Sequence, residues 1–116
     1  MQIGDVIASI RRKKRIDQQE LAKTLNKSIG YISQIENGHR KPSIKLLKAI
    51  ATELDVPLSA ILFQLFEEKH FRSRKGLEVF KTAKPIMDDL IDLFIEEKVK
   101  KVIKRKSKPL RKRVSD

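Results

Sequence analysis

Apolar residues in the first 66 positions recur at three- and four-residue spacing, in five short runs separated by turn and capping residues. This spacing predicts helices with one buried face each. No segment alternates between apolar and polar residues with period two, so the sequence predicts no strand. We therefore expect an all-α fold that begins with a domain of five short helices. The apolar positions of the five runs are Ile3, Val6, Ile7 and Ile10; Leu21, Ala22 and Leu25; Ile29, Ile32 and Ile35; Leu46, Leu47, Ile50, Ala51 and Leu54; and Leu58, Ile61, Leu62, Leu65 and Phe66.

Residues that begin and end helices lie between these runs. Asp17 is followed three residues later by Glu20, the spacing of a capping box at a helix start. Asn26 tolerates the left-handed conformation with which helices end, and Asn37 with Gly38 is expected to end the third helix. These positions predict short helices joined by tight connections. The expected caps or first residues of the last three helices are Ser28, Ser43 and Pro57.

The charge of the chain is distributed unevenly. Its formal net value of +12 at pH 7 implies attraction to polyanions such as nucleic acid. Residues 1–66 carry 11 basic and 6 acidic residues, residues 67–97 carry 6 and 8, and residues 98–116 carry 10 and 1. We therefore expect a mildly basic domain over residues 1–66, a near-neutral section after it, and a strongly basic end.

The rest of the chain is expected to hold a connector, residues 67–84, a long amphipathic helix, residues 85–105, and a disordered basic tail, residues 106–116. Pro85 suits the first position of that helix. The helix has an apolar stripe that must be covered. The stripe either folds back on the first domain or forms the seam of a homodimer, and we favour self-association; the acidic residues 88–97 can instead receive a regulatory protein partner. The stripe consists of Met87, Leu90, Ile91, Phe94, Ile95, Val99, Val102 and Ile103.

The composition argues against several classes of site. There is no cysteine, and His39 and His70 lie far apart, so we expect no disulfide, no metal site and no cofactor. Neither a phosphate-binding glycine loop nor a Ser/His/Asp arrangement occurs, so we expect no catalytic residues and no enzyme. No apolar run approaches the roughly 20 residues that span a bilayer. We therefore expect a cytoplasmic protein that has no membrane partner.

The third expected helix, residues 28–37, has an unusual outer face. At about 100° per residue, Ile32, Ile35 and Glu36 fall on the buried side. The opposite side carries small, polar and uncharged residues, whereas a merely solvated face would more often carry Lys and Glu. Such a face suits the major groove of DNA, where amides and hydroxyls exchange hydrogen bonds with base edges and a glycine lets the backbone come close. Its residues are Gly30, Ser33, Gln34 and Asn37, with Ile29 and Tyr31 on the flanks.

Groups around this helix suit contacts with phosphates. A helix start capped by Ser28 offers free backbone amides, and Gln18 can donate with its side chain. Arg40 and Lys41 follow the helix and can reach the DNA strand beyond it. Tyr31 either packs on its neighbours or donates its hydroxyl to a phosphate.

The stretch QQELAKTLNKSIGYISQI, residues 18–35, followed by ENGHRKPS, resembles the helix-turn-helix of the lambda-repressor and Cro-like family. The resemblance covers residues 3–63 and implies the five-helix fold of that family. The positions at which the family pattern is met are Gln18, Ala22, Asn26, Ile32 and Ile35.

The resemblance also implies a function. Family members place the third helix in the major groove and bind as dimers to two-fold symmetric operators. Several relatives have Gln or Arg where this chain has Ile29 and Gly30, so its readout is expected to rely on a thymine methyl contact and on DNA shape. The implied base contacts are Ile29, Gly30, Ser33 and Gln34. The full set of expected phosphate contacts is Gln18, Ser28, Tyr31, Asn37, Arg40 and Lys41.

One ion pair is expected inside the domain. Arg11 lies four residues after Ile7 and Glu36 four after Ile32, so each places a charge at the margin of an apolar stripe. We expect them to pair, as equivalent residues do in similar proteins. Arg11 begins the cluster RRKKR, residues 11–15, whose last four residues are either solvated surface or phosphate contacts.

Taken together, these features predict a sequence-specific regulator of transcription that binds double-stranded DNA, as a dimeric repressor. The alternative is a protein-interaction module, antitoxin-like or coactivator-like, whose C-terminal helix binds another protein.

Overall fold

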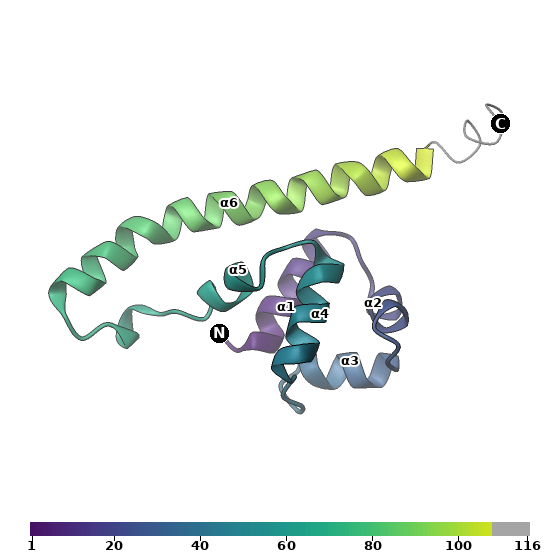
Figure 1. Cartoon of the computed structure of the whole chain (residues 1–116), viewed down its shortest axis with the longest axis horizontal. Coiled ribbons are helices and arrows are strands. Elements are labelled where there is room, and N and C mark those ends of the chain that lie inside the picture. The colour runs from purple at the N-terminus through teal and green to yellow at the C-terminus, as the bar shows by residue number, and fades with distance from the viewer. Residues whose placement is uncertain (108–116) are drawn as a thin grey trace.

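The computed structural model of the chain describes the backbone of residues 1–107 and the side chains of residues 1–96. All regular structure in this part of the chain is helical, as the apolar spacing predicted. Five short helices form a cluster, and a long sixth helix runs along one side of it (Figure 1). The elements are α1 (Ile3–Lys13), α2 (Gln18–Thr24), α3 (Ile29–Glu36), α4 (Ile44–Leu54), α5 (Leu58–Phe63), a short 3-10 helix η1 (Glu68–His70) and α6 (Arg74–Ser107).

The predicted caps hold the starts of α2, α3 and α4. The Asp17 carboxylate accepts a hydrogen bond from the backbone N–H of Glu20 at 2.7 Å and completes the capping box. Ser28 Oγ and Ser43 Oγ each accept from the backbone N–H three residues later, at 3.0 and 3.1 Å. Asn26 and Gly38 have φ values of 56° and 84°, the left-handed conformation expected of them. Local sequence therefore determines where these helices begin and end.

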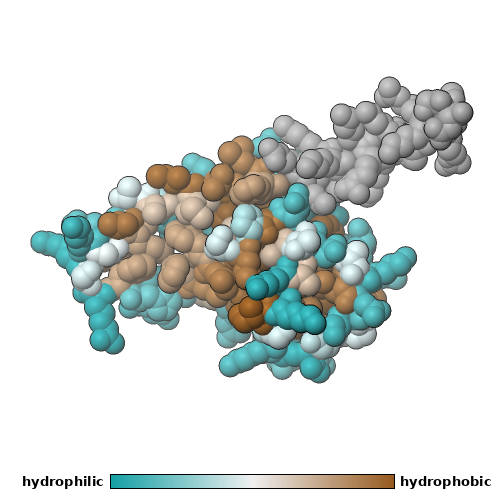
Figure 2. Space-filling view, viewed as in Figure 1, coloured by the Kyte–Doolittle hydropathy of each residue, from teal (hydrophilic) through white to brown (hydrophobic). Residues whose placement is uncertain are grey.

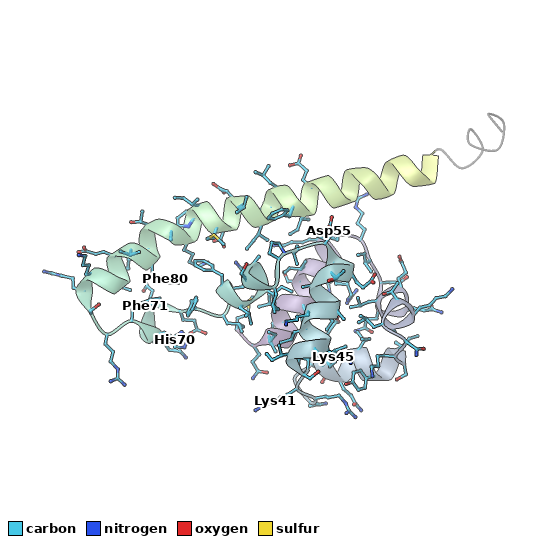
Figure 3. The ribbon with its side chains drawn as sticks, viewed as in Figure 1. Lys41, Lys45, Asp55, His70, Phe71 and Phe80 are labelled. Atoms are coloured by element: carbon cyan, nitrogen blue, oxygen red, sulfur yellow. The ribbon has the colours of Figure 1, made fainter. Side chains whose placement is uncertain are left out.

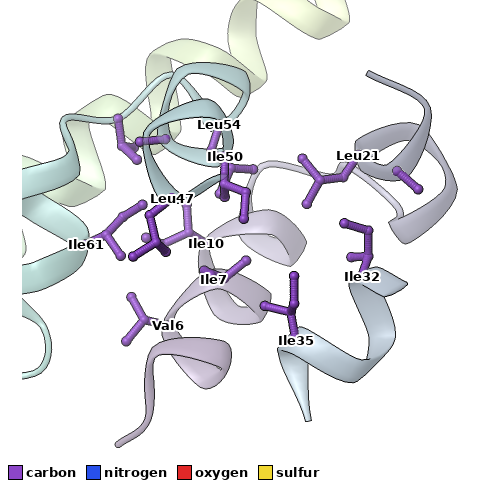
Figure 4. Packing of buried hydrophobic residues seen from close by; sticks show 13 residues of the cluster. Val6, Ile7, Ile10, Leu21, Ile32, Ile35, Leu47, Ile50, Leu54 and Ile61 are labelled. Atoms are coloured by element: carbon purple, nitrogen blue, oxygen red, sulfur yellow. The ribbon is translucent and has the colours of Figure 1, made fainter. Parts of the chain in front are cut away.

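The buried apolar faces of α1 to α5 meet in one core. Figure 4 shows α1 and α3 side chains meeting those of α2, α4 and α5. The sequence spacing predicted most of these residues, because a helix in a small domain buries the side on which its apolar residues repeat. The buried core residues are Val6, Ile7, Ile10, Leu21, Ala22, Ile32, Ile35, Leu47, Ile50, Ala51, Leu54, Val56 and Ile61.

Lys14 of the basic cluster, like Arg11, lies in the interior. Its side chain is completely buried, and its Nζ donates to the backbone carbonyl of Asp55 at 3.2 Å. Asp55 ends α4 with a φ of 55°. Both sequence interpretations of Lys14, solvated surface or phosphate contact, are therefore wrong. Its neighbours Arg12, Lys13 and Arg15 are exposed.

The last helix starts eleven residues earlier than predicted. α6 begins at Arg74, where Ser73 Oγ accepts from the backbone N–H of Gly76 at 3.0 Å, and Pro85 lies inside the helix. The predicted boundaries at residues 67–84 and 85–105 were therefore wrong. A proline removes one helical hydrogen bond, but Pro85 is exposed to water, and packed residues on both sides of it hold the helix against the domain.

One face of α6 packs against the rest of the chain. Ile91 and Ile95 are buried with Ala60 of α5, and Phe94 packs against the main core. Phe80 is buried among aromatic rings, with the ring of Phe71 stacked on it at a centroid distance of 4.7 Å. For these three residues of the predicted stripe, folding back on the first domain is the alternative observed, whereas Leu90 of the same stripe remains 43% exposed. The predicted residues Val99, Val102 and Ile103, and the tail from residue 108 onward, lie outside the side chains described.

A second apolar face of α6 remains exposed. Figure 2 shows apolar residues gathered over the middle of the molecule, where α6 passes the five-helix domain, and hydrophilic residues at the left end and at the lower right. The exposed stripe, called the outer stripe below, consists of Val79, Ile86, Leu90 and Leu93, between 43% and 65% exposed. No helix within residues 1–107 has a segment that is both long and apolar enough to cross a membrane.

Candidate nucleic-acid interface

α3 lies on the side of the domain away from α6 (Figure 1). Ile32, Ile35 and Glu36 are buried, as the helical wheel predicted. On the outer side, Gly30 and Gln34 are exposed and Ile29 is 46% exposed, while Ser33 is half-buried. The predicted base-contacting residues therefore lie together on one uncharged surface that no other helix covers with the side chains of residues 1–96.

A buried ion pair holds α3 against α1. Arg11 Nε lies 2.6 Å from Glu36 Oε2, and Arg11 Nη2 donates to Glu36 Oε1 at 2.9 Å, so the predicted pair is present and has two parallel hydrogen bonds. Arg11 Nη1 also donates to the backbone carbonyl of Ile16, in the turn before α2, at 2.8 Å. This pair fixes the position of the C-terminal end of α3.

Gln18 belongs to the same network. Its side-chain Nε2 donates to Glu36 Oε1 at 2.8 Å, so Glu36 accepts from both α1 and α2. The sequence interpretation assigned Gln18 only a phosphate contact and missed this bond. The amide nitrogen has a second N–H, which remains chemically able to donate to another group. The network thus joins α3 to both α1 and α2 through Glu36.

Sequence reasoning also missed a cluster of contacts beside Gln34, on the outer face of α3. Arg40 Nε donates to Gln34 Oε1 at 3.1 Å, and the Arg40 backbone N–H donates to the Gln34 carbonyl at 3.1 Å. The Arg40 guanidinium lies 4.6 Å from the centre of the Tyr31 ring, and Lys27 Nζ lies 5.0 Å from it. Tyr31 therefore packs against two cations, and packing on its neighbours is one of the two roles expected of it.

The loop after α3 presents further donors. Asn37 Oδ1 accepts from the backbone N–H of His39 at 3.1 Å, so its amide nitrogen is the group that can donate outward. Lys41 and Lys45 are exposed, and Figure 3 shows both at the end of the domain formed by α3 and the start of α4. Basic residues thus lie beside the uncharged face of α3. This arrangement suits a polyanion that also presents hydrogen-bonding groups.

Gly30 has space around it. A Cβ added there would meet only Ser28 Oγ, at 4.0 Å, and the residue does not have a positive φ. The described part of the protein therefore gives no internal reason for a glycine inside a helix, which costs about 1 kcal/mol relative to alanine.

A helix-turn-helix family model matches residues 7–61. The transcriptional regulator ClgR of Mycobacterium tuberculosis is 38% identical over 65 residues, which cover 56% of this chain and 58% of ClgR. The immunity repressor protein of Bacillus phage phi105 is 30% identical over 94 residues, which cover 78% of this chain and 65% of that protein. The ImmF control region 10 kDa protein of the same phage is 39% identical over 59 residues, 51% of this chain and 66% of that protein. The chain thus spans about three-fifths of the length of these relatives.

Proposed function

From the membership of residues 7–61 in the lambda-repressor and Cro-like helix-turn-helix family, we propose that this chain is a DNA-binding transcriptional regulator, acting as a repressor in the cytoplasm. A transcriptional regulator and a phage immunity repressor are among its relatives. The observation that supports the proposal best is the exposed, uncharged face of α3 with basic residues beside it. A repressor of this kind needs no chemistry of its own, because it acts by occupying its operator.

In the proposed complex, α3 lies in the major groove. Ile29 offers its exposed methyl groups to a thymine methyl, Ser33 and Gln34 form hydrogen bonds with base edges, and Gly30 lets the helix approach closely. The buried network around Glu36 keeps α3 in one position relative to α1 and α2, so the helix enters the groove without reorganisation.

Phosphate contacts surround the base contacts in this proposal. The N-terminus of α3 at Ser28 and the second amide N–H of Gln18 would contact one strand, while Arg40 and Lys41 would contact the strand beyond. The Tyr31 hydroxyl and the Asn37 amide nitrogen would add two further donors. These contacts fix the register of the protein on the duplex and carry little sequence information.

Replacing Gln34 with alanine is expected to weaken binding to the preferred duplex by about 1–3 kcal/mol, because a base contact is lost. Binding to unrelated DNA should change little. Fluorescence anisotropy with duplexes selected from random sequences measures both. An equal loss on every sequence would contradict a role in base readout, and a wild-type chain that selects no sequence would overturn the proposed function.

Replacing Gly30 with alanine is expected to have opposite effects on stability and binding. The domain should gain about 1 kcal/mol, because alanine is the better helix former and its methyl group has space. Specific DNA binding should weaken, because that methyl group would lie between the helix and the groove. Thermal unfolding and anisotropy on one preparation separate the two effects. Unchanged affinity would show that the backbone at Gly30 does not approach DNA.

We propose a second copy of this chain as the partner of the outer stripe. The segment 74–84 carries four basic residues and one acidic residue, while the segment 88–97 carries five acidic residues and none that is basic. An antiparallel pair of α6 helices would place each basic segment against the acidic segment of the other copy, whereas a parallel pair would oppose like charges. The 94-residue match to the phage repressor is longer than residues 1–66 and so extends beyond the helix-turn-helix domain.

Replacing both Ile86 and Leu93 with aspartate is therefore expected to convert a dimer into a monomer, because four charges would enter one apolar seam. Sedimentation equilibrium checks the mass. Ser59→Asp is the matched control, since it adds a charge at an exposed position on α5. A wild-type chain that is monomeric at micromolar concentration would contradict the dimer and favour the alternative, in which the outer stripe binds a different protein.

A further inference from the structure

We infer that Gln34 and Arg40 act as one recognition unit that donates hydrogen bonds and therefore selects guanine rather than adenine. The inference depends on the proposed function, because it assumes that α3 lies in the major groove. It adds Arg40, a loop residue after α3, to the residues that determine which base is bound.

The orientation of the Gln34 amide follows from its partner. Arginine carries only N–H donors, so the atom of Gln34 that lies 3.1 Å from Arg40 Nε must be the amide oxygen. The two residues are joined a second time by the bond between the Arg40 backbone N–H and the Gln34 carbonyl. The Tyr31 ring, 4.6 Å from the guanidinium, supports Arg40 from another side. Three contacts thus hold the pair in one arrangement although both side chains are exposed.

This arrangement changes what Gln34 can offer to a base. A free glutamine recognises adenine with two bonds, because its oxygen accepts from N6–H while its nitrogen donates to N7. Here Arg40 already occupies the oxygen, and Gln34 presents the two N–H groups of Nε2. The second lone pair of the oxygen is a poor acceptor for adenine N6–H, because the guanidinium charge lies beside it and repels the partial positive charge of the amino group.

Guanine meets these requirements. Its major-groove edge carries two acceptors, O6 and N7, and no donor. The Gln34 amide N–H groups donate to these acceptors, and the Arg40 charge strengthens the interaction instead of opposing it. A thymine O4 supplies only one acceptor and so makes the weaker contact.

The test is selection of bound duplexes from random DNA with four proteins: the wild-type chain, Gln34→Ala, Arg40→Ala and Lys41→Ala. The base pair that loses its preference in Gln34→Ala is the one that Gln34 contacts. At that pair the wild type should prefer guanine by about tenfold, the lower part of the range for a two-bond contact. Arg40→Ala, which frees the Gln34 oxygen, should prefer adenine there. Lys41→Ala removes the same charge one residue later and should weaken binding without changing the preferred base.

A wild type that prefers adenine at that pair would overturn the inference while leaving the proposed function intact, and so would Arg40→Ala retaining guanine. A wild-type chain that enriches no sequence would overturn the proposed function and this inference with it. Circular dichroism of Arg40→Ala, an exposed position, verifies that the variant is folded.

Discussion

Replacing Arg11 with methionine is expected to lower the free energy of unfolding by about 3–5 kcal/mol, enough to unfold much of the protein. Both charged side chains of the pair are less than 10% exposed, so the substitution leaves the Glu36 carboxylate buried without its cation. It also leaves the Ile16 carbonyl without its donor. Urea denaturation followed by circular dichroism measures the change.

Two further variants distinguish the ion pair from a general loss of charge. Arg12→Met removes a neighbouring exposed cation and should change stability by less than about 0.5 kcal/mol. A double variant, Arg11→Met with Glu36→Leu, should recover part of the stability, because no uncompensated charge remains buried. If Arg11→Met proved as stable as Arg12→Met, the pair would not be what holds α1 against α3.

Replacing Gly4 with alanine is expected to cost about 3 kcal/mol, the upper part of the range for overpacking a core. Gly4 lies where α1 meets the C-terminal end of α3. A Cβ at this position would lie 2.7 Å from the backbone oxygen of Glu36 and closer still to that of Ile35. Backbone oxygens in a helix cannot move aside as a flexible side chain can, so α1 and α3 would have to separate.

A loss of stability in Gly4→Ala would be informative, because helix propensity alone predicts a gain of stability for this substitution. Alanine is favoured over glycine inside a helix by about 1 kcal/mol. Gly30→Ala, measured by the same denaturation, should show that gain, since its Cβ would meet open space. Equal behaviour of the two variants would mean that α1 and α3 are not in close contact at Gly4.

Sequence reasoning predicted the features that depend on neighbouring residues. Cap residues and their spacing predicted that three helices begin after Asp17, Ser28 and Ser43. The structure has a helix beginning after each of these residues. Sequence reasoning failed at α6, because a proline was taken as a helix start. Whether a helix continues through Pro85 depends on how the residues before and after it pack. The spacing of apolar residues within one segment does not reveal which other segment packs against them.

The candidate site divides in the same way. The outer face of α3 was predictable, because a helix with a buried stripe exposes the side opposite to it. The Arg11–Glu36 pair was predictable because each of the two residues lies at the margin of the apolar stripe of its helix. The bonds of Lys14 to Asp55 and of Gln18 to Glu36 were not, because each joins helices whose relative positions the spacing does not give. The Gln34–Arg40 bond was also missed, because it closes across the turn after α3.

The proposed complex requires the outer face of α3 to enter the major groove. The most direct test is a nuclear magnetic resonance titration of isotope-labelled protein with a duplex obtained by selection, following the backbone amides of the chain. We expect the largest shift changes on residues 28–34 and on Arg40 and Lys41, with α6 little affected. Shift changes concentrated on α1 or α6, with α3 unchanged, would contradict the proposed complex.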